Sequence, residues 1–538
     1  MSDYHSFFKG KRVTVMGLGL LGRGLGDAIF LAECGAELTV TDLRDEKTLA
    51  PSVSKLSALG GSASGGQNFK ISKPIQFVLG KHRLEDFRNR DFILKAAGVS
   101  LDSPYIAEAR KQGIPIEMDA SLFAKLMPKG VTIVGVTGTR GKSTVTALIY
   151  EILSFATRYT LHATRAKVFR GGNLVSEATL PLLKKVRSGD IVVLELDSWQ
   201  LQGFHDAKLS PQVAVFTTFL DDHLVYYQGD RERYFEDKVA IFRYQKPDDI
   251  LIAGERVAKL ISSRRFNLKS GKRVNLNGGE GSTLNLGKGR TLRVAKASDI
   301  PSGWKTPLLG EHNLENIACA LNVAKHFKIP INVVRKAVEH FKGVPGRLEY
   351  LRTVRGVKIY NDNNATTPDA TLAALRALGD SRNKIKDSGT HASSILNHES
   401  DKHIVLIMGG TDKGLDMSKL VEEIPKHCKA AVFLKESGTE KLLVTYNVKR
   451  EAPEKDSRKT LHATRYTLKN TPIYALGTLK NCVKQAMSIA KRGDTVLFSP
   501  AFASFGRWFR NEYDRGQQFV DIVKKSGPPH SVHPHTKL

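Results

Sequence analysis

The chain has 538 residues, 41% of them hydrophobic, which is enough for two or three domains with ordinary buried cores. No apolar run reaches the roughly 18 residues that a membrane span needs, and no secretory signal precedes the first strand pattern, so we expect a cytoplasmic protein. The formal net charge is +28, but the basic residues are scattered and no nucleic-acid-binding motif accompanies them. A solvated basic surface or anionic small-molecule substrates are therefore favoured over nucleic acid.

A strand, a glycine-rich turn and a helix are predicted near the N-terminus. Residues 11–15 have a strand pattern, the turn GLGLLG of residues 17–22 follows, and a helix pattern continues through Cys34. A second strand pattern, 37–41, ends at Asp42, about 20 residues after the turn. In such a unit the turn receives a diphosphate and the acidic residue receives the attached nucleoside. The pattern fits a nicotinamide-dependent enzyme or a nucleotide-linked substrate, and the first domain ends near residue 120.

The most informative stretch is 131–153, which reads VTIVGVTGTRGKSTVTALIYEIL. An apolar strand, a glycine turn and apolar residues at helical spacing give the order strand, phosphate loop, helix. Lys142 would neutralise the outer phosphates, and the hydroxyl of Ser143 or Thr144 would reach a magnesium ion. The glycine spacing departs by one residue from the strict Walker pattern, and a glycine turn without a nucleotide is the weaker alternative. The residues expected around the phosphates of ATP are Gly138, Thr139, Gly141, Lys142, Ser143 and Thr144.

Polar residues follow several other predicted strands. Asn173 closes a Gly-Gly-Asn turn, Glu195 lies in the strand 191–196, and His223 follows the strand 213–219. The carboxyl ends of parallel strands share one edge of a sheet, where ligands bind. A carboxylate, an imidazole and an amide oxygen beside the phosphates would suit magnesium, although each residue alone is more often solvated.

Three further features lie in the remainder of the chain. The helix pattern 230–245 contains Lys238, which by itself is typical of a surface lysine. Asn313 and Asn316 lie on one face of a predicted helix, where they could hold a nucleotide or cap the helix. After Arg347, five short apolar strands alternate with helix patterns, which predicts a third α/β domain. These strands span 357–360, 404–408, 431–434, 472–475 and 495–498.

A seven-residue repeat, ATRYTLH, is sampled twice, in residues 156–165 and 460–468. A heptad coiled coil needs two apolar positions per repeat, and this sequence has little more than one. Our hypothesis is that both copies are insertions from a translated repetitive DNA element, tolerated because they fall in surface loops.

Several motifs taken together resemble the Mur ligase family, and they occur in family order over nearly the whole chain. They are GTRGKST, GGN, LELDSWQLQ, DDHLVYY, GEHNLENIACALN, PGRLE, NDNNATTPDATLAAL, GGTDKGLD and SPAFASFGRWFRNEYDRGQQF.

The resemblance implies a three-domain α/β enzyme. Residues 1–120 would form a Rossmann-like UDP-substrate domain, 121–343 a phosphate-loop ATPase domain with a mostly parallel sheet, and 344–525 a Rossmann-like amino-acid domain, followed by a disordered tail, 526–538. By the family's pattern, a substrate carboxylate attacks the γ-phosphate of ATP to give an acyl phosphate, and an amine then attacks that carbonyl through a tetrahedral intermediate.

Within the family, GGTDKG and SPAFAS are most similar to members that join D-glutamate to UDP-N-acetylmuramoyl-L-alanine with ATP and two Mg²⁺ ions, as monomers. The alternatives are a Mur-type ligase for a different amino acid or carboxylate, and a non-catalytic nucleotide-binding regulator. The catalytic and phosphate-loop residues are all retained, which argues against the regulator.

The resemblance also assigns roles to individual residues of this sequence. Catalytic roles fall on Lys142, Glu195, His223 and Lys238, and the metal ligands would be Thr144, Glu195, His223 and Lys238, the last as a carbamate. ATP would also contact Asn313, Asn316, Arg347 and Asp362; the UDP substrate would contact Gly17, Gly19, Leu20, Leu21, Asp42, Arg44 and Asn173; and the amino acid would contact Lys413, Ser504 and Tyr513.

The sequence departs from the family's pattern at four places. Leu21 stands where Ser or Thr is common, Gly346 where some D-glutamate ligases have His, and Asn364 where Lys is frequent. The aromatic position near Tyr513 aligns only with a one-residue shift.

Overall fold

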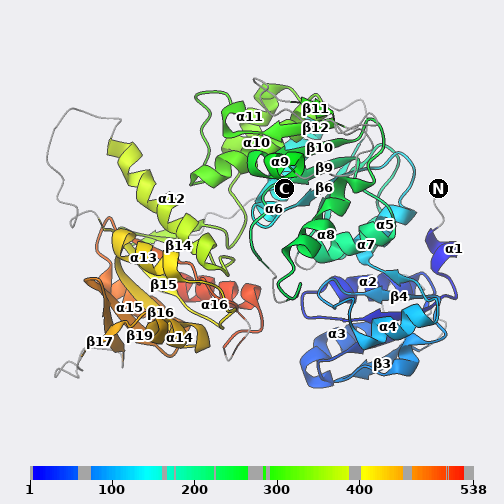
Figure 1. The fold of residues 1–538 in the computed structure, drawn as a ribbon, viewed down its shortest axis with the longest axis horizontal. Coiled ribbons are helices and arrows are strands. Elements are labelled where there is room, and N and C mark those ends of the chain that lie inside the picture. Colours follow the sequence, from blue (N-terminus) through cyan, green and yellow to red (C-terminus); the bar gives the residue numbers. More distant parts are fainter. Residues whose placement is uncertain are drawn as a thin grey trace. The chain divides into compact units, whose positions relative to one another are not determined.

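The computed structural model describes residues 4–58, 74–159, 166–174, 177–222, 226–263, 283–285, 291–386, 402–451, 463–504, 506 and 508–525. The chain divides into two compact units (Figure 1). Residues 1–306 and 314–341 form the first unit, and residues 307–313 and 342–538 form the second. His223 and the tail 526–538, for which the sequence makes predictions, lie outside the described residues.

The first sheet of the first unit is parallel throughout and has the strand order β3-β2-β1-β4-β5. This is the strand order of a Rossmann-like fold, in which the order reverses beside β1. The GLGLLG turn follows β1 and therefore lies at the point where such folds bind ligands. The strands are β1 (Arg12–Met16), β2 (Glu37–Asp42), β3 (Gln76–Leu79), β4 (Phe92–Lys95) and β5 (Ile116–Glu117), with helices α1 (Tyr4–Phe8), α2 (Arg23–Glu33), α3 (Glu46–Ala58), η1 (Leu84–Phe87), α4 (Pro104–Lys111) and α5 (Asp119–Leu126).

The second sheet of the first unit has the order β11-β12-β10-β9-β6-β8-β7 and is parallel except for β11, which runs antiparallel to β12. The mostly parallel sheet that we predicted is confirmed. Its strands are β6 (Thr132–Thr137), β7 (Val168–Gly172), β8 (Ile191–Glu195), β9 (Val213–Phe216), β10 (Ile250–Gly254), β11 (Thr283–Asn285) and β12 (Thr291–Ala295). The associated helices are α6 (Lys142–Tyr159), η2 (Leu180–Lys184), α7 (Ser198–Asp206), α8 (Arg231–Arg243), α9 (Glu255–Ser263), η3 (Ala297–Asp299), α10 (Glu311–His326) and α11 (Ile331–His340).

The second unit contains a mixed sheet of order β13-β14-β20-β15-β16-β19-β18-β17, in which β14, β20, β15, β16 and β19 run parallel. All five strands predicted from the sequence are confirmed. The strands are β13 (Glu349–Val354), β14 (Val357–Asn361), β15 (Ile404–Met408), β16 (Cys428–Leu434), β17 (Lys449–Arg450), β18 (Thr464–Leu468), β19 (Thr471–Leu476) and β20 (Thr495–Phe498). The helices are α12 (Pro368–Lys386), α13 (Ser418–His427), α14 (Ser437–Thr445), α15 (Leu479–Ile489) and α16 (Glu512–Lys525).

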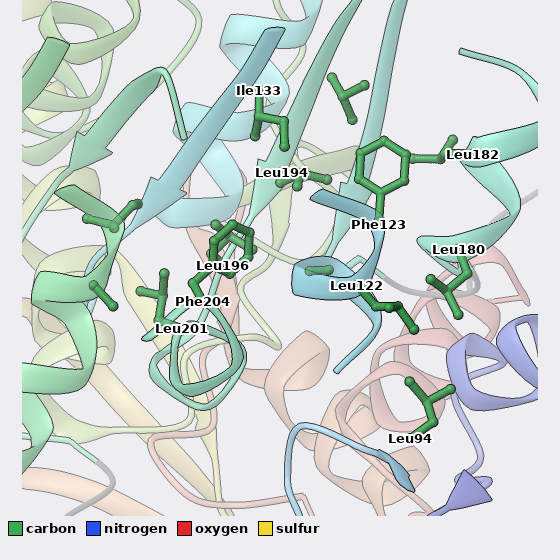
Figure 2. Close-up of a cluster of buried hydrophobic side chains, with 14 of the residues drawn as sticks. Leu94, Leu122, Phe123, Ile133, Leu180, Leu182, Leu194, Leu196, Leu201 and Phe204 are labelled. Atoms are coloured by element: carbon green, nitrogen blue, oxygen red, sulfur yellow. The ribbon is translucent and has the colours of Figure 1, made fainter. Parts of the chain in front are cut away.

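One hydrophobic cluster of the first unit includes residues of both of its sheets, among them Leu94 of β4 and Leu194 of β8. Figure 2 shows Leu122 and Phe123 of α5 beside Leu180 and other apolar side chains of this cluster. Buried apolar area is the main source of stability, so this shared cluster ties the two sheets together.

The hypothesis that both repeat copies fall in surface loops is wrong for the residues that the structure describes. Residues 464–468 do not lie in a loop but form β18, which pairs antiparallel with β19 from Thr464 to Leu468. The residues are Thr-Arg-Tyr-Thr-Leu, and β-branched and aromatic side chains favour strands, so the sequence suits the sheet that it joins. In the first copy, residues 156–159 end α6 and residues 160–165 are not described.

Helices long and apolar enough for a transmembrane span are absent from the described part of the chain.

Candidate active site

The strand register places the predicted site residues of the first unit at one edge of its second sheet. Glu195, the last residue of β8, is paired with Val136 of β6 and with Gly172 of β7, while Thr137 is paired with Phe216 of β9. The phosphate loop after Thr137, the carboxylate of Glu195 and the Gly172-Asn173 turn are therefore neighbours. The backbone N–H of Asn173 donates to the carbonyl of Glu195 at 2.7 Å.

Two glycines of the phosphate loop are required by close approach as well as by their backbone angles. Gly138 has φ 147° and Gly141 has φ 86°. A Cβ atom at Gly138 would overlap the hydroxyl of Thr217, and one at Gly141 would overlap the amide oxygen of Asn316. The loop is thus packed against α10 and against the residues that follow β9, where the backbone N–H groups of Thr139 and Arg140 both donate to Thr218 at 2.8 Å. β9 ends at Phe216, earlier than predicted, and the hydroxyl of the next residue, Thr217, lies within hydrogen-bond distance of the carbonyls of Thr137 and Arg140.

Lys142 lies folded back over the phosphate loop. Its Nζ donates to the carbonyl of Gly138 at 2.9 Å and to that of Thr139 at 3.2 Å. Lys142 also begins α6, where the helix N-terminus favours anions. The lysine charge and the helix N-terminus therefore act at the same place.

Lys238 is not the surface lysine that its sequence context alone suggests. It is 1% exposed, and its Nζ donates to the carbonyl of Gly138 at 3.1 Å and approaches the hydroxyl of Thr137 at 3.5 Å. Burial, followed by the charge of Lys142, lowers the pKa of Lys238 well below its ordinary value of 10.5. Two lysines therefore meet at the carbonyl of Gly138, and the buried one is pushed toward its neutral form.

Glu195 is 3% exposed, and its Oε2 has no hydrogen-bond partner among the described residues. An unsatisfied buried carboxylate oxygen is costly, and a cation is a suitable partner for it. Thr144 is also buried at the start of α6. The described residues include no group of three or more His, Cys, Asp or Glu side chains arranged for a metal.

The first glycine loop is held by the aspartate that was predicted to contact the nucleoside. The backbone N–H of Gly19 donates to Asp42 Oδ2 at 2.9 Å. The backbone N–H of Arg44 donates to Asp42 Oδ1 at 2.9 Å, and its guanidinium lies 3.4 Å from that oxygen. Leu20 and Leu21 lie partly exposed between Gly19 and the start of α2. Gly17 packs closely against Ala96, so the structure brings Asp42, Arg44 and the loop together.

In the second unit, Asp362 lies at the carboxyl end of β14, deeply buried. Its Oδ2 accepts from the Ser499 hydroxyl at 2.8 Å, and its Oδ1 accepts from the backbone N–H of Leu348 at 2.9 Å. Burial raises the pKa of Asp362 to about 7, opposed by these hydrogen bonds and by the charge of Arg347. Arg347 and Asp362 are thus close enough to interact electrostatically.

The loops that follow β15 and β20 pair with each other. Thr411 and Ala503 exchange two backbone hydrogen bonds, of 3.0 and 3.1 Å. This pairing brings the GGTDKG and SPAFAS segments together, although they are far apart in sequence. Lys413 Nζ donates to the hydroxyl of Thr366 at 3.1 Å, and the Ser504 hydroxyl donates to Glu512 Oε2 at 3.4 Å.

Tyr513, next to Glu512 in α16, is 37% exposed. Asn313 falls in the second unit, where its amide donates to the carbonyl of Leu309 at 2.7 Å, whereas Asn316 falls in the first unit beside the phosphate loop. Both asparagines nevertheless belong to the single helix α10, three residues apart, as the sequence predicts.

Sequence reasoning missed Arg515, which is 0% exposed. Its guanidinium donates to the side-chain and backbone oxygens of Asn363 and to the carbonyls of Phe502 and Ala503, at 2.9 to 3.3 Å. Burial lowers the pKa of Arg515 to about 10. The arginine thus braces the SPAFAS loop, and only its place inside a quoted motif could have drawn attention to it.

Glu436 was also missed. One oxygen accepts weakly from the Thr411 hydroxyl at 3.4 Å, and the other is buried without a partner among the described residues. Burial raises the pKa of Glu436. No motif marks this residue, because it follows β16 in an ordinary strand-to-helix connection.

Two of the departures from the family's pattern contact each other. The backbone N–H of Asn364 donates to the carbonyl of Gly346 at 2.9 Å, and its amide donates to the carbonyl of Pro345 at 3.2 Å. A Cβ atom at Gly346 would lie 3.0 Å from the Asn364 amide nitrogen. The glycine and the shorter side chain therefore fit together at the turn before Arg347.

The fold and the site together define a class of protein: a multidomain α/β enzyme with a phosphate loop for a nucleoside triphosphate and a further Rossmann-like sheet on each side of it in the sequence. A family model described as the Mur ligase middle domain matches residues 136–324.

Curated relatives match almost the whole chain. A UDP-N-acetylmuramoylalanine--D-glutamate ligase of Roseiflexus sp. (strain RS-1) is 34% identical over 96% of this chain and 98% of its own length. A ligase of the same name from Borreliella afzelii (strain PKo) is 31% identical over 96% of this chain and 99% of its own length. A UDP-N-acetylmuramate-alanine ligase structure from Thermotoga maritima aligns with a TM-score of 0.50 and 18% identity, covering 96% of this chain and 100% of that chain, which supports the fold.

The chain belongs to the Mur ligase family, the ATP-dependent ligases of peptidoglycan synthesis. The resemblance found in the sequence motifs is therefore confirmed.

Proposed function

We propose that this protein is the ligase that joins D-glutamate to UDP-N-acetylmuramoyl-L-alanine with hydrolysis of ATP to ADP and phosphate. The observation that carries the proposal is that Lys142 and buried Lys238 both donate to the carbonyl of Gly138. Glu195, whose Oε2 has no hydrogen-bond partner among the described residues, ends the neighbouring strand β8. The names of the relatives from Roseiflexus and Borreliella support D-glutamate as the amino acid.

The proposed chemistry has two steps. A carboxylate oxygen of the UDP-linked substrate attacks the γ-phosphorus, and ADP leaves, so that an acyl phosphate is formed. The amine of D-glutamate then attacks the acyl carbon, and phosphate leaves from a tetrahedral intermediate that also loses a proton. In this scheme Lys142 and the N-terminus of α6 offset the negative charge that develops on the transferred phosphoryl group.

Lys238 has a further proposed role as a carbamate. A neutral amine attacks the carbon of CO₂, a C–N bond forms, and the amine loses a proton, which leaves a carboxylate on the lysine. Burial favours the neutral amine that this reaction needs, because it lowers the pKa of Lys238. The product would place a negative charge beside Lys142 and supply oxygen ligands.

The residues present fit magnesium. The unsatisfied Glu195 oxygen, the Thr144 hydroxyl and a carbamate on Lys238 are hard oxygen donors, which Mg²⁺ prefers. His223 is a proposed additional ligand by resemblance. Bound magnesium, with two ions expected, would neutralise charge on the phosphates.

In the second unit, Lys413, Ser504 and Tyr513 are proposed to hold the amino acid, and Arg347 and Asp362 to contact ATP. The paired loops at Thr411 and Ala503 support the first assignment, because they bring Lys413 and Ser504 onto neighbouring segments. Asn313 and Asn316 are proposed for the adenine side of ATP, and Asn173 with Gly17, Asp42 and Arg44 for the UDP substrate.

The remaining proposals concern the chain as a whole. We propose domains of residues 1–120, 121–343 and 344–525, a monomer, and action in the cytoplasm, where ATP is available. The middle range contains all of the residues 136–324 that match the family's middle domain.

An isotope experiment tests both the reaction and its acyl phosphate. The enzyme is incubated with ATP, Mg²⁺, D-glutamate and UDP-N-acetylmuramoyl-L-alanine carrying ¹⁸O in its carboxylate. Because the attacking oxygen stays with phosphorus, one ¹⁸O should appear in each phosphate released. Amide formation with unlabelled phosphate would refute the acyl phosphate, and no amide formation would refute the ligase.

A further inference from the structure

Helix α2 begins at the first glycine loop and faces the chain segment that follows the Gly172-Asn173 turn. The residues of α2 that contact this segment are Arg23, Gly26, Asp27, Phe30 and Glu33. Their spacing of three, one, three and three residues places them along a single face of the helix. The partners of this face are Asn173, Ala178, Leu180 and Lys184.

The middle of this contact is tight and buried. A Cβ atom at Gly26 would lie 2.6 Å from the Cβ of Ala178, so only glycine lets the helix approach this closely. Asp27 accepts a hydrogen bond from the backbone N–H of Leu180 at 3.0 Å, away from solvent. These contacts fix where the first turn of α2 lies relative to the segment after β7.

The same segment is connected to the predicted magnesium side of the site. The backbone N–H of Gly172 donates to the hydroxyl of Thr179 at 3.1 Å, and that hydroxyl donates to Asp119 at 3.0 Å. Asn173, the next residue, donates its backbone N–H to the carbonyl of Glu195. The first turn of α2 is therefore linked through Asn173 to the backbone of Glu195.

Arg23 makes the link at Asn173. It is the first residue of α2, directly after Gly22, and its Nη1 donates to Oδ1 of Asn173. The charge of Arg23 also acts on the carboxylate of Asp27, four residues along the helix, where it opposes the rise in the pKa of that group caused by burial. An arginine side chain has five N–H donors and no acceptor. Asn173 must therefore turn its oxygen toward Arg23 and keep its NH₂ group for another partner.

We infer that Arg23 is a positioning residue for the UDP-linked substrate: it sets the orientation of the Asn173 amide so that the NH₂ group donates to an anionic oxygen of that substrate. This inference rests on the proposed function. A reversed amide would instead present its oxygen to the same anion, which would repel it. Nothing in the sequence pattern points to Arg23, because its role depends on a residue 150 positions away.

Kinetic constants of three Arg23 variants test this inference. Arg23→Met removes the donor and should raise the KM for UDP-N-acetylmuramoyl-L-alanine by about tenfold, a typical effect of one hydrogen bond. Arg23→Glu, whose carboxylate would require the NH₂ group of Asn173 to face it, should raise this KM further. Arg23→Lys retains a donor and should recover most of the affinity. The KM for ATP should stay within about twofold of the wild-type value in all three.

Two controls separate positioning from a general structural role. Glu33→Gln breaks the contact with Lys184 on the same face of α2 and should leave both KM values unchanged. In an Asn173→Ala background, Arg23→Met should cause no further rise in KM, because Arg23 acts through Asn173.

The inference would be overturned if Arg23→Met left the substrate KM unchanged, if it raised both KM values equally, or if it acted equally in the Asn173→Ala background. Each of these outcomes can occur while the wild-type enzyme still forms the amide, so they are distinct from a failure of the proposed function, in which the wild-type enzyme forms no amide at all.

Discussion

Single side chains of the phosphate loop region carry the proposed chemistry, and Lys142 is the first of them. Lys142→Ala should lower kcat by about a thousandfold, because removing one charge-stabilising group from a transition state commonly costs this much. Steady-state phosphate release measures the loss. The matched control is Lys129→Ala, which removes an exposed lysine just before β6 and should have no effect. Turnover of Lys142→Ala at the wild-type rate would exclude the role given to this lysine.

Lys238 provides a chemically distinct test. Lys238→Ala should be inactive, and formate, acetate or propionate should restore part of the activity, because a small carboxylate can occupy the space of the missing carbamate. The side chain is buried against Gly138 and Thr137, so the deletion leaves a cavity beside the loop. Phosphate release is measured with each sodium carboxylate.

Sodium chloride at the same ionic strength is the control for the carboxylates. Restoration by chloride, or full activity of Lys238→Ala without any addition, would contradict the carbamate.

The raised pKa of Asp362 should make the stability of the second unit depend on pH. Its pKa is about 7 in the folded protein, against an ordinary value of 3.8. The folded state therefore binds a proton more tightly than the unfolded state, and stability falls as pH rises from about 4 to about 7. The effect is at most about 4 kcal/mol, from about three pKa units at 1.4 kcal/mol each.

Asp362→Asn should remove this dependence and make the second unit more stable than the wild type at pH 8. An asparagine can keep the contacts, because the Ser499 hydroxyl also reaches Thr371 at 2.9 Å and can accept from an amide. Calorimetric unfolding of the two proteins at pH 5 and pH 8 measures the difference. An equal pH dependence in both proteins would show that another group is responsible.

At the scale of elements, the strands predicted best are those with continuous apolar runs bounded by small or polar residues. β15 and β20 begin and end where the sequence predicts. The sequence did not indicate β4, which has four residues and ends in the buried Lys95, or β7, which ends in two glycines. A lysine and a pair of glycines are both atypical of buried strands, and pairing with neighbours that are distant in sequence overrides these local preferences.

β18 yields a prediction about the repeat. Replacing residues 464–468 with a Gly-Ser linker of equal length should lower the unfolding temperature by about 5 °C or more, because it removes the pairing with β19 and the buried side chain of Leu468. The melting temperature of the purified variant measures this. An unchanged melting temperature would support the original hypothesis that the copy is a dispensable insertion.

At the scale of the whole molecule, the sequence predicted an α/β protein, which the three sheets confirm, and the motifs taken together predicted the family. It also predicted that Glu195 lies near the phosphate loop, since strand ends gather at one sheet edge. It did not predict that Arg23 contacts Asn173 or that Arg515 contacts Asn363, since both are side-chain contacts between distant segments. Such contacts depend on how elements pack, which no local pattern encodes.

The most direct test of the central claim is ATP-dependent phosphate release by the full-length enzyme with Mg²⁺ and UDP-N-acetylmuramoyl-L-alanine. D-glutamate, L-glutamate, L-lysine, meso-diaminopimelate and L-alanine are compared as the amino acid. We predict sustained phosphate release and a new amide product with D-glutamate, and at most about a hundredth of that rate with the others. A preference for another amino acid would contradict the assigned substrate, and no release with any amino acid would contradict the ligase itself.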